Sequence, residues 1–463
     1  MERHVQVTKK AAHLLYLAAA CLYMLFSSAC AHYAIDDKPL SQWTPERGSA
    51  SAKGMTASER SSELLVLVAF SGGGTRAASF SYGVLQELAD TEVFTAKGPR
   101  PLLKEIDEIS SVSGGSFTAA YYGLYGDRIF EDFEERFLRQ DVQSSLMWKV
   151  VRPLNWFRLG SSAYGKADMA AEYYDKILFD GATFADMYRP DAPVVVINST
   201  DLATGLRFPF TRPFFDALCL DLDQYPISRA VTASSAVPGI FSPINIKNHA
   251  GSCEYEPPDW LAEAVKDKRS TNRKMQARTI QGYLDSKKQP WLFLVDGGVA
   301  DNLGLRDFYN FFELTRDLEY SLKMIQHDNV RQILIISVDS HTKPTKEWIF
   351  SRANPSLMQV LDSVSSVQIG LYSLDTMEIV RNAFEKWTAE LTAAGHPVSF
   401  HFIEANFAGV ENEDDRNKLY EIGTSFSLPD EEVDLLISTA RQALRQSPYF
   451  QEFLAENKKL SQQ

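Results

Sequence analysis

The chain has 463 residues, of which 45% are hydrophobic and 12% aromatic, which is enough for a large core in one big domain or two. Its formal net charge of −13 argues against a protein that binds nucleic acid through a basic surface. Four cysteines are too few for a disulfide framework. Cys219 and Cys253 could pair in an oxidising compartment, but two separate buried thiols is the simpler interpretation.

The N-terminal segment, residues 1–30, has the pattern of an export signal. Basic residues precede an apolar run from Ala11 to Ala29, and small residues end the run. Cys30 follows and resembles the acylated cysteine of a bacterial lipoprotein signal, although Ser27 stands where such signals usually carry leucine. The run is also close to the roughly 17–25 residues that span a bilayer, so an uncleaved anchor is the alternative to a signal peptide. We therefore expect a protein of the bacterial cell envelope, attached to the membrane through its N-terminus, with its folded domain outside the cytoplasm.

Residues 31–61 are polar, with scattered Ser, Gly and Pro, and are predicted to be a flexible linker. Because a linker follows, the apolar run is not interpreted as a helix buried in the fold. The main folded domain is expected over 62–345, with a polar surface insertion at about 248–288. A mainly helical C-terminal region, residues 346–463, is expected to pack on that core.

Six apolar runs predict strands in the folded part. The first is continuous, which is typical of a strand buried on both faces. Helical patterns, among them Ala77–Ala89 and Ile227–Val237, alternate with these runs, and this alternation indicates an α/β fold with a mostly parallel sheet. The predicted strands are Leu64–Phe70, Ile106–Val112, Val194–Asn198, Trp291–Val295, Gln332–Val338 and Val398–Ile403.

Three unusual loops follow predicted strands. They are Ser71–Arg76, the turn at Ser113, and Asp296–Gly298. Ligands of parallel sheets gather outside the carboxyl ends of the strands. The three loops are therefore expected to converge in space, although they lie far apart in the sequence.

Ser113 is the candidate nucleophile. It stands between a strand and a helix, where Ser111–Gly115 is nearly G-x-S-x-G, with serine in place of the first glycine. A serine hydroxyl is a weak nucleophile until a base takes its proton, and Asp296, at a strand end before two glycines, is the candidate base. Asp301 and Asn302 in the same loop are expected to cap the next helix or to orient Asp296.

Gly73 and Gly74 are the candidate donors to an oxyanion, because backbone N–H groups at a helix start bind negative charge. Arg76 could hold this loop or meet a lipid phosphate. The alternative for a glycine loop at a helix start is a nucleotide phosphate site. However, neither the Lys-Ser/Thr of a P-loop nor G-x-G-x-x-G is present.

These residues, in this order, resemble the patatin-like phospholipase family. The resemblance covers about Leu64 to Val338 and depends on four motifs in the right order. Ser71–Arg76 resembles the oxyanion loop of the family, Ser111–Gly115 its nucleophile elbow, Ala233–Phe241 a stretch that members carry between elbow and acid, and Asp296–Gly298 its Asp-Gly-Gly box.

The resemblance implies a three-layer α/β/α sandwich with a mostly parallel central sheet, to which the sequence adds a helical C-terminal extension. It also implies a Ser–Asp dyad without histidine, in which Ser113 is the nucleophile, Asp296 the general base, and Gly73 and Gly74 the oxyanion donors. The implied reaction is hydrolysis of carboxylic esters of membrane lipids, with no cofactor and no metal. The sequence identifies no protein partner.

Two other functions are weighed against this one. Ser113, Asp296 and His341 follow the chain order of an α/β-hydrolase triad, which makes a Ser–Asp–His esterase the near alternative. A non-catalytic lipid-binding scaffold of the envelope would keep the fold and need neither Ser113 nor Asp296. The aromatic stretches Trp148–Phe157 and Phe208–Phe215 could line an acyl channel, or they could be ordinary core and lid packing.

Overall fold

The computed structural model describes residues 37–45, 60–161, 163–269, 271–315, 318–343, 347–350 and 352–462. The predicted signal or anchor and Cys30 lie outside these residues. Across the described ranges, no helix combines the length and the hydropathy that crossing a bilayer requires.

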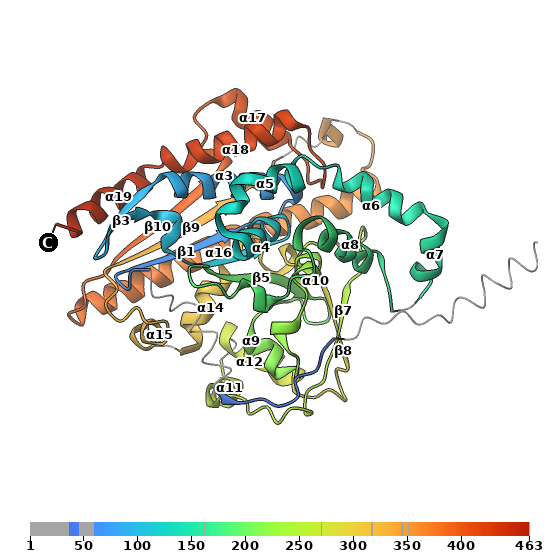
Figure 1. Cartoon of the computed structure of the whole chain (residues 1–463), viewed down its shortest axis with the longest axis horizontal. Helices are drawn as coiled ribbons and strands as arrows, with labels where there is room; N and C mark the ends of the chain where they lie inside the picture. Colours follow the sequence, from blue (N-terminus) through green and yellow to red (C-terminus); the bar gives the residue numbers. More distant parts are fainter. Residues whose placement is uncertain are drawn as a thin grey trace, which may run out of the picture.

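One sheet of eight strands forms the centre of the molecule (Figure 1). The order along the sheet is β10-β9-β1-β4-β5-β8-β7, and β6 pairs with the end of β5. The strands from β10 to β5 are parallel, whereas β6 and β8 run antiparallel to β5 and β7 runs antiparallel to β8. The strands are β1 (Leu64–Phe70), β4 (Ile106–Val112), β5 (Val194–Asp201), β6 (Leu206–Pro209), β7 (Ile244–Lys247), β8 (Trp291–Asp296), β9 (Gln332–Asp339) and β10 (Ser399–Asn406). A separate hairpin joins β2 (Glu92–Thr95) to β3 (Gly98–Pro101).

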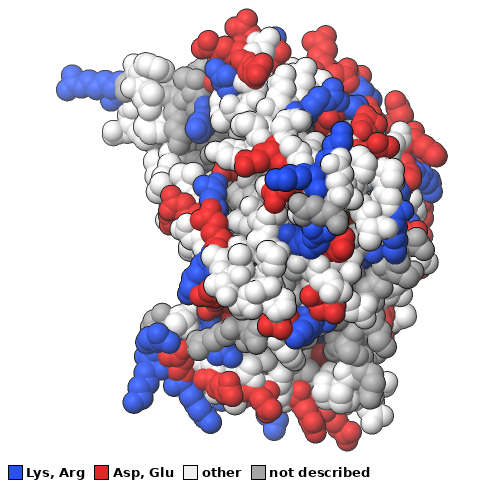
Figure 2. Space-filling model, turned by 90° about the vertical axis from the view of Figure 1, so that its left-hand side faces the viewer, with Lys and Arg blue, Asp and Glu red and all other residues white. Residues whose placement is uncertain are grey.

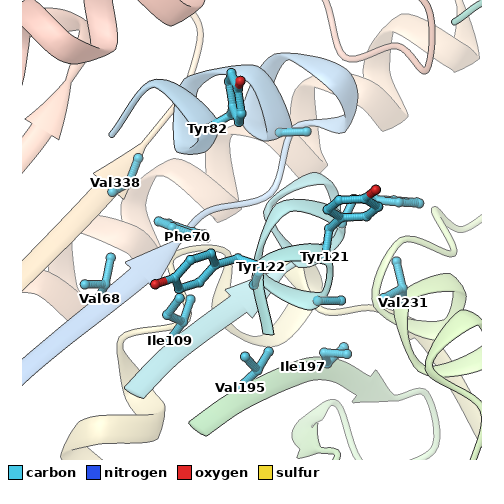
Figure 3. Close-up of a cluster of buried hydrophobic side chains, with 14 of the residues drawn as sticks. Val68, Phe70, Tyr82, Ile109, Tyr121, Tyr122, Val195, Ile197, Val231 and Val338 are labelled. Carbon is cyan, nitrogen blue, oxygen red and sulfur yellow. The ribbon is translucent and has the colours of Figure 1, made fainter. Parts of the chain in front are cut away.

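Helices cover both faces of the sheet and make three layers. Side chains alternate along β1, so that Val68 and Phe70 join one core cluster while Leu65 and Leu67 join another. Figure 3 shows the first cluster, on the face toward Tyr122. That face is covered by α3 (Gly74–Asp90), α4 (Gly114–Tyr125) and α18 (Asp430–Arg445), and the opposite face by α14 (Arg306–Thr315), α15 (Leu318–Met324) and α16 (Leu357–Ala393).

The predicted fold class is confirmed, and all six predicted strands are present with small differences at their ends. The helix predicted over Ile227–Val237 is shorter in the structure, where α10 spans Ile227–Ser234. The carbonyl groups of Ser234 and Ala236 instead accept hydrogen bonds from the amides of Gly297 and Asp296. The end of α10 thereby holds the loop that carries the candidate base.

The C-terminal region completes the core. Its strand β10 extends the parallel part of the sheet beside β9, and its helix α18 packs along α3. Gly83 permits this contact, since a Cβ there would lie 2.5 Å from the carbonyl oxygen of Ile437. The helix α19 (Pro448–Leu460) follows and ends the described chain at the left of Figure 1.

Residues 37–45 fall within the segment predicted to be a flexible linker, and for these residues the prediction is wrong. Leu40 is buried, and the ring of Trp43 packs edge-to-face on Tyr255. The carboxylate of Asp37 accepts a hydrogen bond from the amide of Lys247. The few apolar side chains of this mostly polar stretch are therefore enough to dock it on the domain.

The insertion at 248–288 has a small core of its own. It holds α11 (Asp259–Lys266) and α12 (Asn272–Tyr283), whose apolar side chains pack with Ala217. Helix α9 (Arg212–Ala217) supplies that alanine, so the insertion is joined to the main domain through this contact.

Cys219 and Cys253 form a disulfide, with their Cα atoms 5.5 Å apart, and the interpretation as two separate thiols is wrong. The amides of Leu40 and Trp43 donate to the carbonyl groups of Cys219 and Cys253. The bridge therefore ties the insertion to the segment that follows α9, and the two hydrogen bonds attach residues 37–45 to both cysteines.

We expect replacement of both cysteines, Cys219→Ala with Cys253→Ala, to lower the free energy of unfolding by about 2–4 kcal/mol, because the unfolded chain regains the entropy of an open loop. Urea unfolding with and without a reductant measures this effect. The reductant should destabilise the parent chain and leave the double variant unchanged. Equal stability of the parent and the double variant would show that the bridge does not constrain the chain.

Candidate active site

Ser113 sits on a tight turn between β4 and α4. Its φ is 50° and its ψ −119°, a conformation that costs a non-glycine residue about 1–3 kcal/mol. The turn is fixed by its neighbours, because the Ser113 amide donates to the hydroxyl of Ser234 at 2.8 Å and the Ser113 carbonyl accepts from the amide of Ser116 at 3.0 Å. This geometry turns the side chain away from the sheet, as the elbow pattern predicts.

The hydroxyl of Ser113 donates directly to Oδ2 of Asp296 at 2.8 Å. The two side chains belong to residues with only 4% and 8% of their surface exposed. The loops of Ser113 and Asp296 therefore converge as expected, although not because both follow parallel strands. β8 runs antiparallel to β5. Residues 199–201 of β5 extend beyond the end of β4, and β8 pairs with this extension so that Asp296 lies opposite Ser199.

Asp296 is held on both sides of its carboxylate. Oδ2 accepts from Ser113, and Oδ1 accepts from the amide of Gly298 at 2.8 Å. Burial raises the pKa of Asp296 to about 6, while the hydrogen bonds from Gly298 and Ser113 act in the lowering direction. At neutral pH the group is mostly ionised yet far more basic than an ordinary aspartate, which suits a general base.

The glycine loop lies against this pair. A Cβ on Gly72 would lie 3.2 Å from Cβ of Ser113, and a Cβ on Gly114 would lie 2.0 Å from the carbonyl oxygen of Gly74. Only glycine permits such approaches. Within the described residues, the amides of Gly73 and Gly74 have no hydrogen-bond acceptor, so these N–H groups at the start of α3 are available to an anion beside Ser113.

Arg76 joins the segments that surround the site. It is buried, and its guanidinium donates to the carbonyl groups of Ser340 at 2.9 Å and Ile422 at 2.8 Å. Burial lowers the pKa of Arg76 to about 10, against the raising effect of Asp339. Both acceptors are backbone groups of neighbouring segments, an arrangement that favours the predicted support of the loop.

Asp301 lies before α14, and its carboxylate accepts a hydrogen bond from the amide of Arg306, the first residue of that helix, at 2.8 Å. This contact is the capping role that was one of two expected for Asp301. The carbonyl of Asn302 accepts from the amide of Gly72, which joins the acid loop to the glycine loop. His341 is half-buried, and its amide donates to Asp339. In the part of the chain that the structure describes, no hydrogen bond joins the His341 ring to the candidate nucleophile or base.

Three residues that support the site were missed by the sequence analysis. Ser234 accepts from the Ser113 amide and donates to the carbonyl of Asn198. The hydroxyl of Thr200 donates to the backbone carbonyl of Asp296, and the carbonyl of Ser425 accepts from the amide of Thr75. Ser234 lies in the Ala233–Phe241 motif, so the sequence pointed to this segment but gave no role for the serine. No local pattern marks Thr200 or Ser425.

The two aromatic stretches have opposite environments in the structure. Phe208, Phe210 and Phe215 are fully buried and pack on one another in the main core. Trp148 and Phe157, by contrast, are exposed at the surface. Among the described residues, no group of three or more His, Cys, Asp and Glu side chains has the arrangement of a metal site.

The fold and the site define an α/β protein with a buried serine–aspartate pair beside a glycine loop. The model of the patatin-like phospholipase family matches residues 68–309, more than half of the chain. The chain belongs to the patatin-like phospholipase family.

Solved structures that resemble the chain include human GIVD cytosolic phospholipase A2, at 12% identity and a TM-score of 0.45, over 92% of this chain and 68% of that one. A complex of the same enzyme with methyl gamma-linolenyl fluorophosphonate and terbium chloride gives 13% identity and a TM-score of 0.41, over 92% and 66%. A comparison with curated proteins gives no significant match.

We expect Gly114→Ala to lower the free energy of unfolding by about 1–3 kcal/mol, because the new Cβ would overlap the Gly74 carbonyl and force the two loops apart. Urea unfolding measures the change. Gly423→Ala is the matched control, since a Cβ there meets no atom within 4 Å. Equal stabilities of the two variants would contradict the close contact between the loops.

Proposed function

We propose that this protein is a serine acyl hydrolase of the lipase or phospholipase A type, which cleaves carboxylic esters of membrane lipids through an acyl-enzyme on Ser113. The observation that carries the proposal is the direct hydrogen bond from the Ser113 hydroxyl to the buried carboxylate of Asp296. Membership of the patatin-like phospholipase family supports a lipid ester as the substrate.

In the first half of the proposed reaction, Ser113 Oγ attacks the carbonyl carbon of the ester while Asp296 takes its proton. The amides of Gly73 and Gly74 donate to the oxyanion that forms. Collapse of the tetrahedral intermediate breaks the bond to the alcohol, and Asp296 returns the proton to the leaving oxygen. The fatty acyl group is left as an ester on Ser113.

In the second half, water attacks this ester and Asp296 takes a proton from the water. The second tetrahedral intermediate collapses, the fatty acid leaves, and Ser113 recovers its proton. Asp296 can act twice because its pKa of about 6 lets it accept a proton and release it again near neutral pH. The arrangement needs no histidine, since the carboxylate contacts the nucleophile directly.

We expect Ser113→Ala and Asp296→Asn each to lower kcat/KM by at least about 10³-fold, because each removes one member of a unit that acts together. His341→Ala should keep the rate within about threefold. The assay follows purified protein on phospholipids, lysophospholipids, triglycerides and short-chain esters, with circular dichroism to verify folding. The opposite pattern, in which His341→Ala abolishes the activity and Asp296→Asn keeps it, would favour the triad esterase.

The pKa of Asp296 sets the expected pH dependence. Because only the ionised carboxylate can accept the Ser113 proton, kcat/KM should fall as the pH falls through about 6. Ser113→Ala removes a hydrogen bond that lowers this pKa, so the Asp296 carboxyl should titrate at higher pH in that variant. Rate profiles from pH 4 to 9 and NMR titration of the variant measure both effects. A flat profile across pH 5–7 would contradict Asp296 as the base.

A further inference from the structure

Helices α6 (Val142–Val151) and α7 (Pro153–Leu159) form a corner at the edge of the molecule, outside the three layers (Figure 1). We call residues 142–159 the docking corner. Val142 and Leu146 anchor α6 in the core, whereas six other large apolar side chains of the corner are exposed and α7 buries no residue. Leu154 is 84% exposed and Trp148 69%. The exposed apolar side chains are those of Met147, Trp148, Val151, Leu154, Trp156 and Phe157.

The corner has a defined shape. The side-chain amide of Asn155 donates to the carbonyl of Lys149 at 2.7 Å, and the indole N–H of Trp156 donates to the carbonyl of Val150 at 3.1 Å. Side chains of α7 therefore satisfy backbone groups at the end of α6. The polar atom of Trp156 is used inside the corner, which leaves the ring to present apolar surface. Several large exposed apolar side chains on two adjoining helices point to a place of interaction.

The positive charge of the docking corner favours an anionic partner. The chain as a whole carries −13, and the face that holds α19 shows Lys and Arg interspersed with Asp and Glu (Figure 2). The docking corner holds Lys149, Arg152 and Arg158 and no acidic residue. Arg158 pairs with Glu172 behind the corner, while Arg152 is exposed at its turn. Exposed Trp, Leu and Phe combined with cations are typical of helices that lie in the interface of an anionic bilayer.

The docking corner is joined to the candidate site. Oγ of Ser425 donates to the side chain of Gln143 in α6 at 3.0 Å, while the carbonyl of the same serine accepts from the amide of Thr75 at 2.8 Å. One residue thus contacts both the first turn of α6 and the helix start beside Gly74. The loop that holds the start of the docking corner is therefore the same loop that contacts the glycine loop of the candidate site.

We propose that the docking corner inserts into the surface of an anionic phospholipid bilayer and brings the site to its lipid. This inference goes beyond a predicted N-terminal attachment, because it assigns a second contact within the folded domain, and it rests on the proposed function only for the identity of the substrate. The net charge opposes binding to anionic lipid, but the local charge of the corner is positive and its apolar side chains are already exposed.

The first test measures quenching of tryptophan fluorescence in the full chain by brominated phospholipids, in vesicles of phosphatidylglycerol with phosphatidylcholine. We expect quenching that is lost in the double variant Trp148→Phe with Trp156→Phe. Trp291→Phe is the matched control, since Trp291 is 46% exposed on β8, outside the docking corner, and it should keep the quenching. Quenching that survives the double variant, or no quenching at all, overturns the proposal.

The second test separates docking from chemistry. Leu154→Asp should lower hydrolysis of vesicle phospholipid at least tenfold and leave hydrolysis of a dissolved short-chain ester within twofold. Tyr449→Asp, at a residue that is 64% exposed on α19, should alter neither. Unchanged hydrolysis of vesicles by Leu154→Asp overturns the docking corner. A third outcome is that the parent self-associates, that Leu154→Asp abolishes this association, and that lipid causes no quenching. This outcome overturns the proposal in favour of a second copy of the chain as the partner. If the parent cleaves no ester but lipid quenches the fluorescence of Trp148 and Trp156, the proposed function fails and the docking corner stands.

Discussion

The hydrogen bond between Ser113 and Asp296 is the interaction on which the rest of the structure depends. The two residues are 183 positions apart and stand on strands that are not neighbours in the sheet. β5 lies between them and pairs in parallel with β4 and in antiparallel with β8. In this structure the contact is made where the sheet changes direction, because β8 runs antiparallel along the end of β5 and stops beside the elbow.

Close packing of backbone makes this contact possible. Gly72, Gly114 and Gly297 each lie where a Cβ would overlap a neighbouring loop or strand. The same packing removes Asp296 from water, and burial raises its pKa, while hydrogen bonds from Ser113 and Gly298 keep the charged form accessible. The raised basicity of Asp296 and its position beside Ser113 thus have the same physical origin, which is the close packing that excludes solvent where the three loops meet.

Much of the fold and of the candidate site could be predicted because the signals are local. A continuous apolar run such as Leu64–Phe70 can hardly be anything but a buried strand, and glycine-flanked residues after such runs mark strand ends. The same logic placed Ser113 and Asp296 together, but it assumed a parallel β8, because a strand's direction is decided by its pairing and not by its composition.

The features that escaped prediction depend on contacts between distant segments. The disulfide of Cys219 and Cys253 requires the insertion to fold back on α9, and the role of Ser425 requires the C-terminal loop to reach the glycine loop. The docking corner was misinterpreted for a related reason. Composition shows that Trp148–Phe157 is aromatic and apolar, but only the packed structure shows that none of the described elements covers it.

The most direct measurement of the central claim is the site of covalent reaction with a fluorophosphonate ester, which traps an activated serine. The folded full chain is treated with the probe, digested, and analysed by mass spectrometry. The account predicts one adduct, on Ser113, formed by the parent chain and not by Asp296→Asn. An adduct on another serine, no adduct on the folded parent, or equal labelling of Ser113 in Asp296→Asn would contradict it.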